Sequence, residues 1–80
     1  MEVIMQTLNK KQVKKYVNSF ENDDWLKMLN GFVESGFTFK ISDKPNNNGL
    51  YDLVVENKKG EVIYDDELAD WYIGELKKYE

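Results

Sequence analysis

The chain contains neither cysteine nor histidine, and its eleven basic residues are all lysines. Without cysteine it has no disulfide framework and no thiolate zinc site, and nothing indicates an oxidising compartment. Without histidine as well, Ser-His-Asp and Cys-His nucleophilic machinery cannot be assembled. The absence of arginine removes the planar fork that most often recognises phosphate or guanine. These absences argue against most hydrolases, the usual zinc sites and sequence-specific DNA reading.

Glycine-rich nucleotide-binding loops are also missing, because the five glycines are isolated from one another. One loop shows a partial likeness to a calcium site: Asn46, Asn48 and Gly49 match the third, fifth and sixth places of an EF-hand loop. Its first place would be Lys44 and its twelfth Val55, so the essential carboxylates are absent. The sequence therefore predicts a turn here, with no metal and no cofactor.

Long hydrophobic runs are absent too. Residues 1–6 lack the basic and apolar regions of a signal peptide, and no segment reaches the length of a membrane span. The net charge is −4, which repels phosphate backbones and makes general nucleic-acid binding unfavourable. We therefore expect a soluble, cytoplasmic protein that does not contact membranes.

The small size of the chain argues against catalysis by a pair of carboxylates. Asp66 and Asp70 are spaced i, i+4, which would place both on one helix face. Acid–base work by such a pair needs a cleft that separates their pKa values, and a chain of 80 residues has little volume for one. The sequence therefore predicts no catalytic residues and no enzyme.

The hydrophobic content of the chain is sufficient for one folded domain over residues 1–80. Hydrophobic residues make up 41% and aromatic residues 14%, enough to build a core without a metal or disulfide. A hydrophobic residue, the N-cap Asn9 and a capping-box Gln12 predict a helix that begins at Lys10. A second helical pattern, from Trp25 to Val33, has the broadest apolar face and is expected to lie deepest.

Strands follow, because the hydrophobic period changes to two from Phe37 onward. We expect three of them, at residues 37–42, 50–56 and 61–65, with a tight turn at 57–60. Pairing is expected to place Leu53 opposite both Phe39 and Tyr64, and to turn Val62 toward the core. Residues 2–7 form either a further edge strand or a lead-in segment.

A final helix is predicted from the acidic residues 65–67 to the lysines 77 and 78, since these charges follow the helix dipole. The predicted fold class is α+β. It has an antiparallel three-stranded meander, with an optional fourth N-terminal edge strand, packed on one face by helices. The predicted order is (β)-α-α-β-β-β-α.

The expected wet side of this sheet and the start of the last helix together carry a large acidic surface with exposed aromatic character. Such a surface is typical of a module that docks onto a basic partner protein, as inhibitors that imitate nucleic acid do. The candidate partner-binding residues are Asp52, Glu56, Glu61, Asp65, Asp66, Glu67, Asp70 and Trp71.

Two other interpretations stay open. The lysine face of the first helix, with Lys11, Lys14 and Lys15, favours weak nucleic-acid binding. Exposed edge strands or aromatic residues favour a homodimer. The composition, with lysine in place of arginine and many asparagines, resembles that of small proteins from phages and mobile elements of bacteria with AT-rich genomes. This resemblance implies an inhibitor or regulator of a host protein and carries no functional residue with it.

Overall fold

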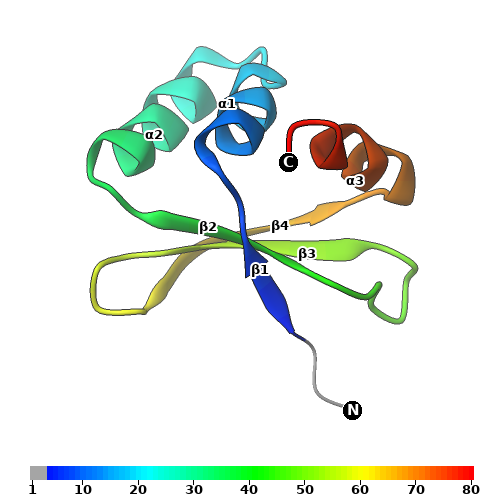
Figure 1. The fold of residues 1–80 in the computed structure, drawn as a ribbon. Coiled ribbons are helices and arrows are strands. Elements are labelled where there is room, and N and C mark those ends of the chain that lie inside the picture. The colour runs from blue at the N-terminus through cyan, green and yellow to red at the C-terminus, as the bar shows by residue number, and fades with distance from the viewer. Residues whose placement is uncertain (1–3) are drawn as a thin grey trace.

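The computed structural model describes residues 4–80 and confirms the predicted α+β fold. Four antiparallel strands form one sheet in the order β1-β2-β3-β4, and three helices complete the domain. The elements follow the chain as β1 (Met5–Thr7), α1 (Lys10–Asn18), α2 (Asp23–Glu34), β2 (Thr38–Ser42), β3 (Tyr51–Glu56), β4 (Val62–Leu68) and α3 (Asp70–Lys77). All three helices lie on one side of the sheet, and no helix or strand of residues 4–80 covers the other side (Figure 1).

The N-terminal segment forms the edge strand β1, which pairs with β2 so that Met5 lies opposite Ser42 and Thr7 opposite Lys40. The strand interpretation of this segment is therefore correct for Met5–Thr7, while Glu2 and Val3 lie outside the described residues. None of the helices in residues 4–80 is long and apolar enough to cross a bilayer.

The predicted capping box at the start of α1 is confirmed. Asn9 Oδ1 accepts from the Gln12 backbone N–H at 2.9 Å, and Gln12 Oε1 accepts from the Asn9 N–H at 2.9 Å. The side-chain NH2 groups of Asn9 and Gln12 donate to backbone carbonyls near the C-terminus. Gln12 Nε2 donates to the Leu76 carbonyl at 3.0 Å, and Asn9 Nδ2 donates to the Tyr79 carbonyl at 2.9 Å. The cap therefore also holds α1 against the C-terminal helix.

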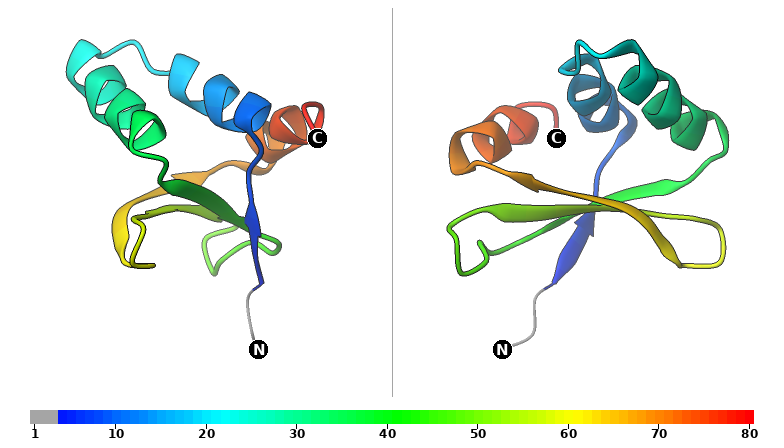
Figure 2. Two further views of the ribbon diagram at one scale, coloured as in Figure 1. Left: turned by 60° about the vertical axis from the view of Figure 1, so that its left-hand side comes forward. Right: turned by 180° about the vertical axis from the view of Figure 1, so that it is seen from behind.

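The expectation that α2 lies deepest is wrong. α1 buries Gln12, Tyr16 and Val17, whereas α2 buries only Leu29 completely. α1 lies between α2 and α3 in the helical layer, so its apolar stripe is enclosed from both sides (Figure 2). A broad apolar face indicates how much surface a helix offers, but burial depends on which neighbours cover it.

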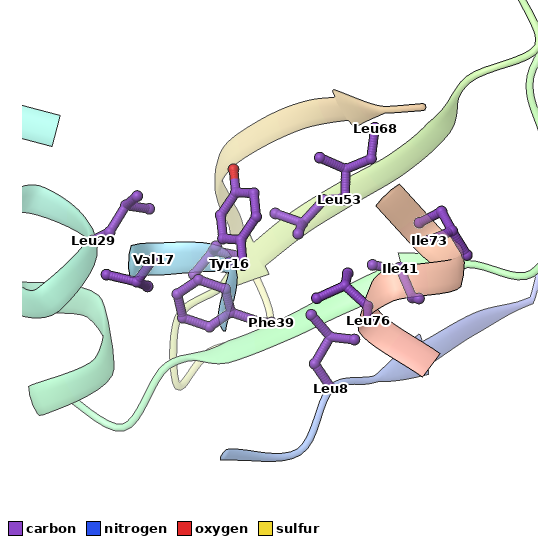
Figure 3. Packing of buried hydrophobic residues seen from close by; sticks show 11 residues of the cluster. Leu8, Tyr16, Val17, Leu29, Phe39, Ile41, Leu53, Leu68, Ile73 and Leu76 are labelled. Carbon is purple, nitrogen blue, oxygen red and sulfur yellow. The ribbon is translucent and has the colours of Figure 1, made fainter. Parts of the chain in front are cut away.

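The core lies between the helical layer and the sheet (Figure 3). Tyr16, Leu29, Leu53, Val55 and Leu76 are at most 1% exposed. The buried hydrophobic cluster also contains Leu8, Val17, Phe39, Ile41, Leu68 and Ile73. Each helix therefore contributes to one continuous core.

The third predicted strand is longer than expected and pairs in a different register. β4 continues to Leu68, and the last helix begins only at Asp70, so residues 65–67 belong to a strand and not to the first turn of a helix. Leu53 lies opposite Ile41 and Asp66, in place of the expected Phe39 and Tyr64.

The predicted inward orientation of Val62 is also wrong, because the pairing of β3 with β4 contains an irregularity. Val55 pairs with Tyr64, but the next residue, Glu56, pairs with Val62, which leaves Ile63 as an extra residue. Because an inserted residue reverses the alternation of side chains, Val62 turns away from the core. It is 55% exposed.

Candidate functional site

The side of the sheet that faces away from the helices is called the open face here. Leu53 and Val55 of β3 point toward the helices and are fully buried, and alternation places Asp52, Val54 and Glu56 on the other side. Residues from all four strands contribute to it: Met5, Lys40, Asp52, Val54, Glu56, Val62, Asp65 and Glu67. The open face therefore carries four carboxylates and one ammonium group.

Two of the carboxylates lie directly opposite one another. Asp52 on β3 pairs with Glu67 on β4, and like charges in this arrangement repel. The amide of Asn46 lies between them: its Nδ2 donates to Asp52 Oδ1 at 3.2 Å and to Glu67 Oε2 at 2.7 Å. These two hydrogen bonds from the asparagine-rich loop thus offset the repulsion between Asp52 and Glu67 that the β3–β4 register creates.

The single lysine of this face is already paired. Lys40 Nζ lies 2.9 Å from Glu56 Oε1, and both side chains are about a quarter exposed. This ion pair neutralises the negative charge of Glu56. Asp52, Asp65 and Glu67 remain as the net negative part of the open face.

An open hollow of about 770 Å³ lies over these strands. Met5, Val54 and Val62 contribute apolar side chains to its lining, and the acidic lining residues are Asp52, Glu56, Asp65, Asp66 and Glu67. Val54 lies directly opposite Asp65 on the neighbouring strand, so apolar and acidic side chains alternate across the sheet. The open face is therefore a negatively charged surface with the apolar side chain of Val54 among its carboxylates.

Asp66 also borders this hollow, but its carboxylate turns to the helical side of the sheet. The hydroxyl of Tyr16 donates to Asp66 Oδ2 at 2.7 Å. Since a phenol has one proton, the hydroxyl of Tyr64, 2.9 Å away, donates to the Tyr16 oxygen. The three side chains form a hydrogen-bonded chain that joins α1 to β4.

Both phenols of this chain hold their protons more tightly than free tyrosine does. Burial raises the pKa of Tyr16, and its hydrogen bonds to Tyr64 and Asp66 raise it further. The pKa of Tyr64 is also raised, chiefly by burial and in addition by the nearby charges of Asp66 and Asp65. These surroundings therefore favour the neutral, protonated form of both Tyr16 and Tyr64.

The other three candidate residues lie away from the centre of the open face. Glu61 precedes β4 at the hairpin, where its carboxylate accepts from Asn57 Nδ2 at 3.3 Å. Asp70 and Trp71 open α3, which lies on the helical side (Figure 1). Trp71 is 72% exposed and contacts Tyr72 edge-on. The structure thus brings together four of the eight candidate residues: Asp52, Glu56, Asp65 and Glu67.

Sequence reasoning missed Met5, Asn46 and Val62 as parts of this surface. The sequence leaves residues 2–7 as either an edge strand or a lead-in segment, which assigns Met5 to no side of a sheet. It also predicts that Val62 faces the core, although Val62 is 55% exposed. The amide donors of Asn46 depend on a loop conformation that composition does not reveal. In the described part of the chain, no three acidic side chains converge in a geometry that would hold a metal ion.

Comparison of the chain with protein-family models, with curated proteins and with solved structures gave no match. The geometry and charge of the chain itself are therefore the basis for its proposed function.

Proposed function

We propose that the protein is a non-enzymatic binding module whose open face docks onto a basic surface of a partner protein. The observation that carries this proposal is a sheet face with no helix of residues 4–80 over it, on which Val54 lies between Asp52 and Glu56 along β3 and opposite Asp65. An apolar centre within a charged rim is the usual composition of a protein-binding surface. The charges select and orient the partner, while the apolar side chain of Val54 contributes to affinity.

The arrangement of the acidic residues supports binding over a purely solubilising role. Carboxylates spread over the surface would keep the chain soluble equally well, without the repulsion between Asp52 and Glu67. Groups that lower stability in this way are expected at functional sites. A basic groove that normally binds nucleic acid is the kind of partner surface that fits, and the module would then act as an inhibitor or regulator.

The test is capture of a partner from cell extract by the immobilised protein. The variant Asp65→Lys/Glu67→Lys reverses two charges on the open face and leaves the Asp66–Tyr16 hydrogen bond intact. The variant Glu21→Lys/Glu34→Lys makes the same change in net charge at two exposed residues near the ends of α2. We expect a protein with a basic surface to be captured by the wild type and by the Glu21/Glu34 variant, and to be lost from the Asp65/Glu67 variant. Equal capture by all three would refute the open face as the binding surface.

A further inference from the structure

A second hollow, of about 580 Å³, lies on the helical side of the molecule. It is formed where α1 and the end of α2 approach the beginning of β2, and the two helices lie side by side above the sheet (Figure 2). Its apolar lining consists of Leu8, Val13, Val17, Val33, Phe37 and Phe39. This volume lies within the range of roughly 300 to 1,000 Å³ that is typical of small-molecule sites.

The rim of this hollow is positively charged, although the chain as a whole is acidic. Lys10 and Lys14 are one helical turn apart on α1, and both line the hollow. Within residues 4–80 neither of them forms an ion pair.

Carboxylates are absent from the described lining. The polar residues that accompany the lysines are uncharged: Thr7, Asn18, Asn30 and Thr38. In a chain with 15 acidic residues, a hollow lined by lysine, amide and apolar groups presents a local field opposite in sign to the net charge of −4. Val33 is 44% exposed at its edge, so apolar surface remains accessible.

From this combination we infer that the hollow binds a small amphiphilic anion, a free carboxylate with a single unbranched apolar chain. The chain lies against Val13, Val33 and Phe37, and the carboxylate lies between the ammonium groups of Lys10 and Lys14. Burial of the chain supplies most of the affinity, while the charges fix its orientation. This site lies on the helical side of the sheet, so it does not depend on the function proposed for the open face.

The lysines of α1 supply a matched pair of variants. Lys10→Gln/Lys14→Gln removes the two charges that line the hollow. Lys11→Gln/Lys15→Gln removes two charges at the same spacing on the same helix, at residues outside the lining. Both variants change the net charge equally, so general electrostatic attraction changes by the same amount in both.

Decanoate, titrated below its micelle-forming concentration and followed by amide chemical shifts in isotope-labelled protein, is the probe. We expect saturable binding, with the largest shifts at Val13, Val17, Val33 and Phe37. Binding to Lys10→Gln/Lys14→Gln should weaken about tenfold, as expected for the loss of two partly exposed ion pairs. Binding to Lys11→Gln/Lys15→Gln should stay within about twofold of the wild type.

Several outcomes would overturn the inference. These are the absence of saturable binding, shifts centred on β4 in place of α1 and β2, and equal weakening in the two lysine variants. Decanol, which has the same chain without the charge, should bind about tenfold more weakly than decanoate. Equal affinity for decanol would show that the lysines do not recognise the head group.

Discussion

Asp65 and Asp66 are neighbours in β4, yet their side chains lie on opposite sides of the sheet in opposite surroundings. Asp66 accepts a 2.7 Å hydrogen bond from a buried tyrosine under the helical layer. Asp65 lies on the open face across from Val54, close to further carboxylates. One carboxylate stabilises the fold, and the other is available for contact with a partner. Sequence neighbours of the same type can therefore serve stability and binding separately.

The largest expected contrast lies between Leu53 and Val54, which are adjacent on β3 and face the two sides of the sheet. Leu53→Ala should lower the free energy of unfolding by about 3 kcal/mol, because a fully buried side chain leaves a cavity. Val54→Ala, on the open face, should cost less than about 1 kcal/mol. Urea denaturation followed by circular dichroism measures both, and equal losses would contradict the assignment of the two sides.

The contrast between the two aspartates is the next largest. Asp66→Ala removes the charged acceptor of the Tyr16 hydroxyl and should lower the free energy of unfolding by about 2 kcal/mol. Asp65→Ala should change it by less than about 0.5 kcal/mol. The same denaturation measurement applies. A loss at Asp65 as large as that at Asp66 would show that the open-face carboxylate is also structural.

Alkaline pH should destabilise the fold through the buried tyrosine on the helical side. Burial raises the pKa of Tyr16, so the native state keeps this proton while the unfolded chain loses it near pH 10. Stability is therefore unaffected below about pH 10 and should fall above it by about 1.4 kcal/mol per pH unit for this residue. Denaturation midpoints measured from pH 8 to 11 test this, and Tyr16→Phe should show a shallower decline. An identical decline in that variant would assign the effect to other groups.

The smallest expected effect has the opposite sign. Glu67→Gln removes the repulsion with Asp52 and keeps an oxygen that accepts from Asn46, so stability should rise by about 0.3 kcal/mol at low ionic strength. Salt screens the repulsion, and the gain should disappear near 1 M salt. Thermal unfolding at the two salt concentrations measures the difference. A destabilised variant would mean that the Asn46 bridge outweighs the repulsion.

Local signals in the sequence were sufficient for most of the fold. The start of α1 follows from Asn9 and Gln12, whose reciprocal hydrogen bonds depend on residues three apart. The turn before β4 follows from Gly60, which adopts a positive φ of 81°. In such segments, short-range chemistry and the final structure agree.

The prediction of a helix start at residues 65–67 is wrong because the same acidic residues suit two structures. Acidic residues are typical of the first turn of a helix, but Asp66 is held in a strand by Tyr16, which is 50 residues away in the chain. The orientation of Val62 depends on the extra residue in the β4 ladder, for which alternation gives no signal. Asp52 and Glu56 lie on the outer side of β3 as alternation predicts, because that strand is regular over these residues.

The contacts from the α1 cap to the last helix have a consequence for the order of folding. Gln12 is 5% exposed and donates to the carbonyl of Leu76, which is synthesised 64 residues later. The first helix therefore lacks its final anchor on a nascent chain until the C-terminal helix has left the ribosome. We expect no stable N-terminal folding intermediate, and the whole domain should form in a single cooperative step.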